Sequence, residues 1–317
     1  MLVLGLAGAA LADPLPSWNA GETKSRITAF VGAVTDPASA DFVPRAERVA
    51  VFDNDGTLWA EKPLYFQALF AFDLLKQRAA ADPSILTSDT LKAAAAGDLE
   101  TVLAGGVEAL LEVVNASHAG LSVADFQAAS RDWLETALHP ETGRPFVAHV
   151  YQPMLELLRF LRDEGFATFI VSGGGIHFIR AYAEDAYGIP PRQVIGTVAE
   201  SAYERVDGVP IIVKKPGIAF LDDKAGKPVG IDRVIGRRPI LAFGNSDGDF
   251  EMLEWVTGGQ GARLGLLLHH TDDAREWAYD RESHVGKLVR GLDEAETRGW
   301  RLVDMARDWK TVFPERE

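Results

Sequence analysis

Two aspartates, placed two residues apart after a short apolar run, have the type and spacing needed for nucleophilic and acid–base chemistry. Residues 48–53 read RVAVFD, and the chain continues Asn54-Asp55-Gly56-Thr57. One carboxylate of such a pair can attack an electrophile while the other transfers protons. Gly56 allows the sharp turn that brings both side chains to one place. An Asp/Gly turn after a strand is also common without any function, so the motif needs support from other motifs.

Polar residues follow two further apolar runs. Ser172 ends residues 166–172 and precedes three glycines, Gly173 to Gly175. Residues 239–244 are followed by the sequence Asn245-Ser246-Asp247-Gly248-Asp249. A hydroxyl beside free backbone N–H groups can bind phosphoryl oxygens, and carboxylate and amide oxygens can bind Mg²⁺. Because ligands bind at the carboxyl ends of parallel strands, all three motifs are expected at one sheet edge.

A lysine is needed at the same edge if the ligand is anionic, and Lys227 is the favoured candidate. It precedes Pro228, which suits the first position of a helix, and Ile231 and Ile235 continue with helical spacing. A helix running back antiparallel to residues 239–244 begins beside the carboxyl end of that strand. Lys224 and Lys215 are the alternatives.

The elements that must position these residues are predicted to form a doubly wound, mostly parallel α/β sheet. Short apolar runs bounded by polar residues are typical of buried parallel strands. They occupy residues 48–53, 166–172, 194–198, 239–244 and 263–268. Helical patterns at 151–164, 178–187 and 250–256 separate them, which favours crossover connections. Residues 204–213, with Asp207-Gly208 at their centre, predict a hairpin.

Residues 58–145 have a different pattern and predict a separate helical domain. Ala/Leu-rich helical stretches occupy residues 64–81, 88–96, 99–114 and 122–137, with no strand-like run between them. The predicted organisation is therefore an α/β core of residues 13–57 and 146–317, interrupted by this helical insertion.

Composition and the first residues restrict the class of protein. The chain has 317 residues, no cysteine and a formal net charge of −14. Disulfides and thiolate chemistry are excluded, and a general affinity for nucleic acid or anionic membranes is disfavoured. Residues 1–12, MLVLGLAGAALA, predict a signal peptide cleaved after Ala12, and hence a periplasmic or secreted protein with no stable membrane association after cleavage. A cytoplasmic location remains the alternative.

The order of the four motifs resembles that of the haloacid dehalogenase superfamily. Asp53-x-Asp55-Gly56-Thr57, Ser172, Lys227 and the cluster from Asn245 to Asp249 match the four signatures in sequence order. The resemblance spans residues 48–253. The second aspartate points to the phosphatase branch, and a helical insertion after it resembles the cap of phosphoserine-phosphatase-like members. The chain departs from the pattern at Asn245, where the family has aspartate.

The resemblance implies a phosphomonoester hydrolase of small organic phosphates. Asp53 would form an aspartyl-phosphate, Asp55 would act as acid and then base, and Thr57 would orient one of these aspartates through its hydroxyl. Phosphate binding is implied for Thr57, Ser172, Gly173 and Lys227, and Mg²⁺ binding for Asp53, Asp55, Asn245 and Asp249. Asp247 is a further candidate ligand that would compensate for the missing charge at position 245.

Several functional questions stay open at this level. A phosphotransferase that uses the same intermediate, or a periplasmic binding protein that has lost activity, are the alternative functions. Candidate substrate contacts in or near the helical insertion are Glu61, Lys62, Tyr65, Arg131, Trp133 and Arg144. The adjacent His269 and His270 are expected near the cleft but suit one metal ion poorly, because neighbouring strand residues point in opposite directions. The sequence does not fix the oligomeric state.

Overall fold

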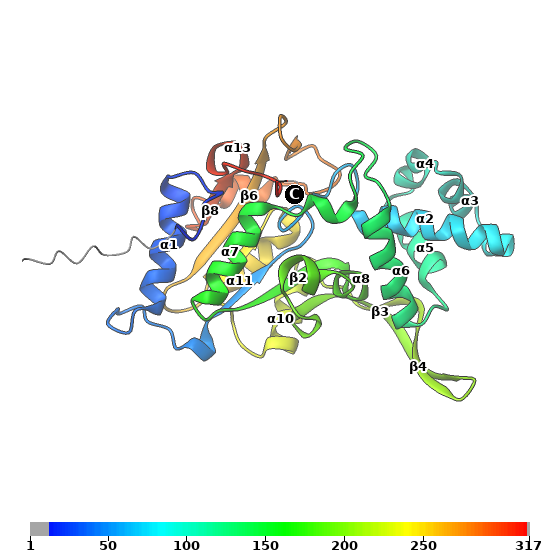
Figure 1. Cartoon of the computed structure of the whole chain (residues 1–317), viewed down its shortest axis with the longest axis horizontal. Helices are drawn as coiled ribbons and strands as arrows, with labels where there is room; N and C mark the ends of the chain where they lie inside the picture. The colour runs from blue at the N-terminus through cyan, green and yellow to red at the C-terminus, as the bar shows by residue number, and fades with distance from the viewer. Residues whose placement is uncertain (1–12, 316–317) are drawn as a thin grey trace, which may run out of the picture.

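The computed structural model describes residues 13–315 as an α/β sheet with a group of helices beside it (Figure 1). The predicted signal peptide, residues 1–12, lies outside these described residues. The sheet order is β4-β3-β2-β1-β5-β6-β7, with β8 paired to β6. The strands are β1 (Val49–Phe52), β2 (Ala167–Gly175), β3 (Val194–Val206), β4 (Val209–Phe220), β5 (Leu241–Gly244), β6 (Leu264–Thr271), β7 (Ala278–Tyr279) and β8 (Arg301–Asp304).

The predicted parallel sheet is confirmed, and its register places the motif residues at one edge. Strands β3, β2, β1, β5, β6 and β8 run parallel, whereas β4 and β7 are antiparallel. Phe52, the last residue of β1, pairs with Ile170 of β2 and Phe243 of β5. The carboxyl ends of the three central strands therefore lie side by side, next to the residues that follow them.

Helices cover both faces of the sheet, which explains why β1 is apolar at every position. The helices outside residues 58–145 are α1 (Glu22–Thr35), α7 (Gln152–Asp163), α8 (Ile176–Arg180), α9 (Ala183–Tyr187), α10 (Gly226–Ile235), α11 (Phe250–Thr257), α12 (Arg290–Glu294) and α13 (Met305–Asp308). Ala50 and Phe52 pack with α1 and α7, whereas Val49 and Val51 pack with α10 and α11. Successive strand residues point to opposite faces, so a strand buried on both faces needs apolar residues throughout.

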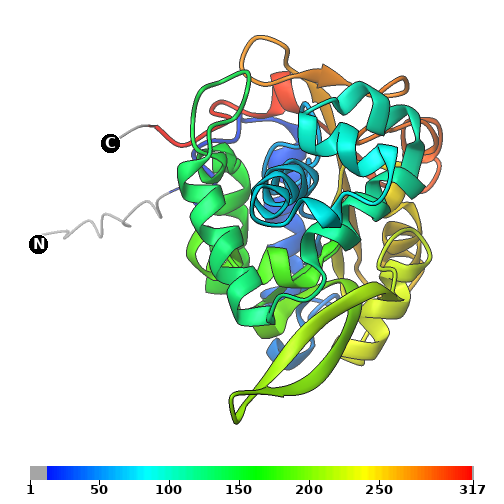
Figure 2. The same ribbon diagram turned by 90° about the vertical axis from the view of Figure 1, so that its right-hand side faces the viewer.

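The segment between β1 and β2 is helical and has its own buried cluster. It contains α2 (Phe66–Ala81), α3 (Asp89–Ala96), α4 (Leu99–Ala104), α5 (Gly106–His118) and α6 (Val123–Thr136), which group beside the sheet in Figures 1 and 2. Leu75, Leu91 and Val102 are buried together between these helices. The helical stretch predicted over 99–114 consists of two helices, α4 and α5, which are separated at Gly105, and Gly106 has a φ of +66°. That this segment is a separate domain stays a prediction.

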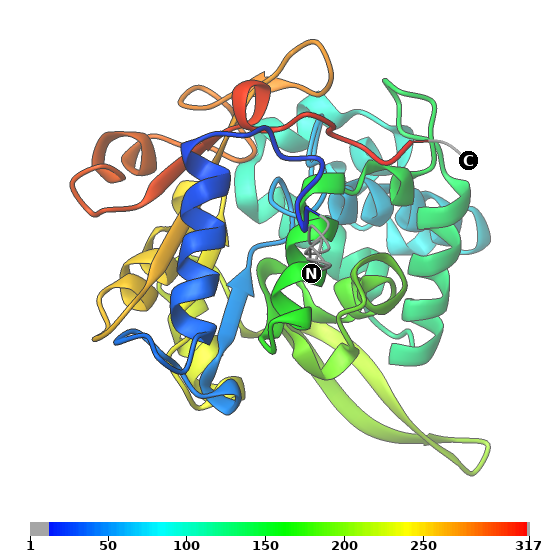
Figure 3. The ribbon, with the colours of Figure 1, turned by 60° about the vertical axis from the view of Figure 1, so that its left-hand side comes forward.

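The predicted hairpin is longer than its sequence signal. Strands β3 and β4 pair around Asp207-Gly208 and project from the body of the molecule (Figures 1 and 3). The base of the hairpin contacts the loop between α5 and α6, because Lys214 N donates to Leu121 O and Gly120 N donates to Lys214 O, each at 2.9 Å. None of the helices within residues 13–315 has the length and apolar character needed to cross a membrane.

Candidate active site

The Asp53 carboxylate meets a buried lysine at the end of β1. Lys227 Nζ lies 2.6 Å from Asp53 Oδ1 and 2.5 Å from Asp249 Oδ1. Lys227 is on α10, whose first turn reaches the sheet edge as its sequence position predicts. All three side chains are buried, with Lys227 2% exposed and Asp249 fully enclosed. One ammonium group therefore bridges the first and fourth motifs.

Asp249 is held by the turn that follows β5. Its Oδ2 accepts hydrogen bonds from the backbone N–H groups of Asn245 and Ser246, at 3.0 and 3.1 Å. Gly244 is required here, because an added Cβ would lie 2.4 Å from the Asp249 side chain. With Oδ1 on Lys227, both oxygens of Asp249 are engaged by protein groups, so its geometry fits a residue that positions Lys227.

The structure assigns Asp247 a capping contact instead of a place beside Asn245. Its carboxylate accepts hydrogen bonds from the backbone N–H groups of Val289, Arg290 and Gly291, at 2.9 to 3.1 Å. These are the first N–H groups of α12, which lack partners within that helix. The expectation that Asp247 compensates for Asn245 is therefore not supported by its contacts, because its oxygens point to another element.

Asp55 and Ser172 face each other across a glycine. Trp59 Nε1 donates to Asp55 Oδ1 at 2.9 Å. The other oxygen, Asp55 Oδ2, faces the glycines that follow Ser172. A Cβ added at Gly174 would lie 3.5 Å from Asp55 Oδ2 and 3.2 Å from Ser172 Oγ. Gly174 N donates to Ser172 Oγ at 3.0 Å, so the hydroxyl proton is available to a ligand. Asp55 of the first motif therefore lies near Ser172 of the second, and Lys227 joins Asp53 to Asp249 of the fourth. The four motifs meet at one sheet edge, as predicted.

Thr57 contacts a different residue from the one expected. Its hydroxyl donates to Asn245 Oδ1 at 3.0 Å instead of orienting Asp53 or Asp55. The other end of the Asn245 amide donates from Nδ2 to Glu61 Oε1 at 2.8 Å. Because a carboxylate only accepts, Glu61 fixes the amide with Nδ2 toward itself. Glu61 is therefore a buried partner of Asn245, not the substrate contact suggested by its place in the insertion.

A buried network supports the turn that carries Asp55. His270 Nε2 contacts Gly56 O at 2.8 Å and its Nδ1 contacts Glu276 Oε2 at 3.2 Å. Tyr279 stacks on His270 with ring centroids 4.3 Å apart and donates to Glu61 Oε1 at 2.8 Å. Gly56 has a φ of +72°, and a Cβ there would lie within 2.3 Å of Glu61. His270 thus holds a backbone position, and no metal role is needed to explain it.

The carboxyl groups of Asp53 and Asp55 have pKa values above their ordinary range. Burial raises the pKa of Asp53 well above its usual value, the Asp249 charge adds to this, and Lys227 opposes it. Burial also raises the pKa of Asp55, against the hydrogen bond from Trp59. Burial works against the charged form of Lys227, but Asp249 and Asp53 outweigh it and raise the lysine pKa. The site is therefore short of positive charge.

Most of the candidate contacts in the insertion have partners within the protein. Lys62 Nζ donates to Ser283 Oγ, Arg131 Nε to Ala181 O, and Trp133 Nε1 to Asp73. The Arg144 guanidinium lies 5.7 Å from the Phe313 ring centroid, and Tyr65 is 39% exposed. The side chains that sequence reasoning missed are Trp59, Gln67 and Tyr279. Of these, only Trp59 lies close to a motif in sequence, and nothing in the pattern marked its indole as a donor to Asp55.

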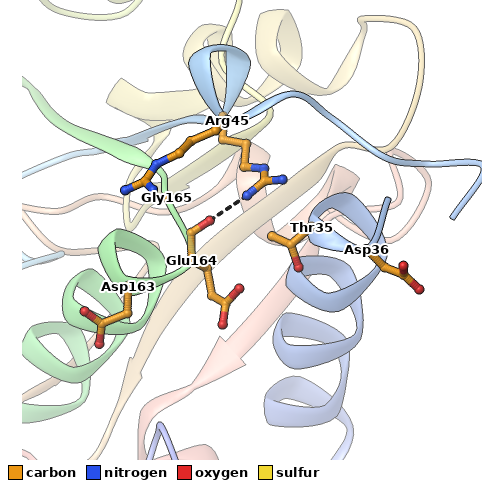
Figure 4. Close-up of a pocket in the computed structure, with 7 residues that line it drawn as sticks. Thr35, Asp36, Arg45, Asp163, Glu164 and Gly165 are labelled. Atoms are coloured by element: carbon orange, nitrogen blue, oxygen red, sulfur yellow. Dashed lines mark hydrogen bonds between the residues drawn. The ribbon is translucent and has the colours of Figure 1, made fainter. Parts of the chain in front are cut away.

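A surface hollow lies at the other end of the strands, away from these motifs (Figure 4). It is lined by Arg48 and Gly165, which precede β1 and β2, together with Thr35, Asp36, Arg45, Asp163 and Glu164. Arg48 already donates to Val43 O and Glu164 O at 2.8 Å. The hollow has neither a catalytic motif nor an unpaired buried charge, so the carboxyl edge is the candidate active site.

The comparisons with known proteins agree with this geometry. A family model described as haloacid dehalogenase-like hydrolase matches residues 50–254, and the chain belongs to this family. The matched range contains all four motifs. No curated protein matches the sequence of this chain.

Solved structures of similar fold include a conserved, functionally unknown protein from Anaerococcus prevotii. The two chains are 16% identical over 79% of this chain and 86% of the other, with a TM-score of 0.53, which shows a shared fold. A phosphoserine phosphohydrolase-like protein from Francisella tularensis is 17% identical over 79% and 98% of the two chains, with a TM-score of 0.40.

Proposed function

We propose that this hydrolase is a Mg²⁺-dependent phosphatase that cleaves small organic phosphate monoesters through an aspartyl-phosphate. The observation that carries the proposal is the pairing of two aspartates with different surroundings. Asp53 is bound by Lys227, whereas Asp55 has one oxygen held by Trp59 and the other beside Ser172. A nucleophile must be ionised and a general acid must hold a proton. Burial raises the pKa of Asp55, which suits an acid, whereas Asp53 needs a bound cation in addition to Lys227 to stay ionised, because burial and the Asp249 charge also raise its pKa.

The residues of the site fit a magnesium ion. The Asp53 carboxylate, the Asp55 backbone carbonyl and Asn245 Oδ1 would supply oxygen ligands, which Mg²⁺ prefers. Asp53, Asp55 and Asp249 share one lysine, so a divalent cation would offset charge that the protein leaves uncompensated. Within residues 13–315, no group of three or more His, Asp or Glu side chains is arranged as a metal site. The ligand set named above would not form such a group, because only one of its ligands is a carboxylate side chain. Bound Mg²⁺ would supply electrostatic stabilisation of the phosphoryl oxygens.

The protein residues would carry the reaction in two steps. Asp53 attacks the phosphorus, the bond to the ester oxygen breaks, and Asp55 gives its proton to that oxygen as the alcohol leaves. Asp55 then takes a proton from water, which attacks the same phosphorus, and phosphate leaves with Asp53 restored as a carboxylate. Lys227 and the Ser172 hydroxyl stabilise the equatorial oxygens throughout, because charge and positioning dominate phosphoryl transfer.

A phosphate-release screen over a panel of phosphate monoesters, with and without Mg²⁺, tests the proposal. We expect release that depends on Mg²⁺ and is lost in Asp53→Asn. Product analysis with added glycerol separates hydrolysis from transfer to an alcohol. Wild-type protein that binds Mg²⁺ but releases no phosphate from any ester, or an Asp53→Asn variant with wild-type activity, would contradict it.

We also propose that the protein is exported. The proposal depends on the apolar segment of residues 1–12 and its Ala10-Leu11-Ala12 end. Amino-terminal sequencing of the protein from the periplasm of a bacterial host tests it, and a mature chain that begins at Asp13 is the expected result.

A further inference from the structure

Two lysines are buried among the described residues, and their surroundings differ. Lys227 is 2% exposed and is bound by two carboxylates, whereas Lys214 is 5% exposed and has neither a salt bridge nor a hydrogen bond to its ammonium group within residues 13–315. Its nearest described partner is the Phe126 ring, with Nζ 4.4 Å from the centroid. Lys214 Nζ is not among the fully enclosed atoms without a partner, so the ammonium group keeps a small accessible surface. A largely buried ammonium without an acceptor is costly to keep, so an unpaired one in a chain of net charge −14 requires an explanation.

Unpartnered imidazole nitrogens lie around this lysine. His177 Nδ1, at the start of α8, and His118 Nε2, at the end of α5, are both buried without a hydrogen-bond partner. The His118 ring packs edge-on against Phe126 with centroids 4.6 Å apart, so His118 and Lys214 share that ring. Burial and the Lys214 charge lower the pKa of His118 to about 3 and that of His177 to about 4. The charges of Arg78 and Arg180 contribute to these shifts of His118 and His177, respectively. At neutral pH the cluster of Lys214, His118 and His177 therefore has one charged ammonium and two neutral imidazoles, with a guanidinium near each imidazole.

The cluster is connected to the phosphate-binding turn. His177 lies two residues beyond Gly175, whose N–H donates to Gln67 Oε1 at 2.6 Å. Thr197 of β3 donates to Gly173 O at 2.7 Å, and Lys214 pairs with Ser201, four residues further along β3. With a rise of about 3.3 Å per residue, the Lys214 backbone is about 13 Å from that turn. A ligand held at Ser172 could reach the cluster with its far end.

We propose that Lys214 and His177 bind a carboxylate at the end of the substrate remote from the phosphate. The substrate class is then a phosphate monoester of an extended hydroxy acid, and this inference rests on the proposed phosphatase function. One ammonium and one neutral imidazole donor match the single charge and the two acceptor oxygens of a carboxylate.

Lys215 provides a matched control. It is the next residue on β4, it is partly exposed, and it is paired with Glu204. The test compares wild type, Lys214→Met and Lys215→Met on the phosphate monoester of 6-hydroxyhexanoic acid and on its methyl ester, which differ only in the charge at the far end. We expect wild type and Lys215→Met to prefer the acid in kcat/KM by about tenfold to a hundredfold, the range of one charge-assisted hydrogen bond. Lys214→Met should lose this preference while its kcat/KM for the methyl ester stays within about threefold.

Two further measurements keep the inference separate from folding and from the proposed function. Lys214→Arg, which retains the charge, should keep part of the preference, and turnover of the methyl ester reports an intact core in every variant. Titration calorimetry of the two esters with Asp53→Asn compares binding without turnover. If wild type hydrolyses neither ester, the phosphate-release screen over the whole panel decides the proposed function, while calorimetry still tests the carboxylate site. The inference would be overturned if wild type had equal kcat/KM values for the acid and the methyl ester. It would also be overturned if Lys214→Met kept the full kcat/KM preference for the acid.

Discussion

Replacing Lys227 by methionine removes the only cation that contacts the Asp53 and Asp249 carboxylates among the described residues. Lys227 Nζ lies within 2.6 Å of an oxygen of each aspartate, so these two oxygens are about 5 Å apart or less. At that distance two negative charges repel by about 3 kcal/mol with an effective dielectric constant of about 20. Both aspartates are buried, so water cannot replace the lost ammonium without a rearrangement.

The expected loss in the free energy of unfolding is about 3–5 kcal/mol at pH 7, the usual result of removing one partner from a buried ion pair. This is a large share of a typical domain stability of about 5–15 kcal/mol. The loss should shrink as the pH falls, because burial raises the pKa of Asp53 and protonation of this carboxylate removes the repulsion. Phosphatase activity should be lost at every pH, because Asp53 would be protonated or unsupported.

Urea unfolding of Lys227→Met in the absence of Mg²⁺, followed by circular dichroism, measures this effect. Lys224→Met is the control, because Lys224 is exposed and only three residues away. It should stay within about 0.5 kcal/mol of wild type, as surface substitutions do. A loss below about 1 kcal/mol for Lys227→Met, or an equal loss for Lys224→Met, would refute the reasoning.

Three further predictions follow from the contacts of the site. Asn245→Asp should lower the free energy of unfolding by about 1–3 kcal/mol in urea titrations, because it replaces the donor to Glu61 with an acceptor, and Glu61→Gln should restore most of it. Asp247→Ala should cost about 0.5–2 kcal/mol through loss of the α12 cap while kcat/KM stays within about twofold. His118 has a pKa of 6.5 in the unfolded chain and of about 3 in the folded chain. The free energy of unfolding should therefore decrease as the pH falls from 6.5 toward 3, by up to about 1.4 kcal/mol per pH unit. His118→Gln should flatten that slope, and an unchanged slope would assign it to other groups.

The parallel strands and the edge at which they end were the part of the fold that the sequence predicted best. Buried parallel strands have nearly continuous apolar runs, and the residues that end them must meet at one edge, so Asp53, Ser172 and Asn245 were expected together. The position of Lys227 followed from the direction of α10. Boundaries were predicted less well, because pairing extends strands beyond their apolar residues, as β6 does through His270.

Contacts between distant segments could not be predicted from local pattern. Glu61 and Tyr279 are far apart in the sequence, and their hydrogen bond depends on β7 lying beside the start of the insertion. Thr57 and Asp247 lie in motifs, but their hydrogen-bond partners depend on the tertiary structure and cannot be predicted from the spacing of residues in the motifs. The strands β7 and β8 and the helix α1 gave no signal that singled them out.

The central claim, that Asp53 is the nucleophile and Asp55 the acid and base, is tested most directly by trapping the phosphorylated enzyme. Asp55→Asn mixed with p-nitrophenyl phosphate and Mg²⁺ should transfer the phosphoryl group, because p-nitrophenolate leaves without a proton, but should hydrolyse the intermediate slowly. After an acid quench and digestion, mass spectrometry should find a phosphoryl group on the peptide that contains Asp53. Phosphate release by the wild type without this modification in Asp55→Asn, or a phosphoryl group on another residue, would contradict the account.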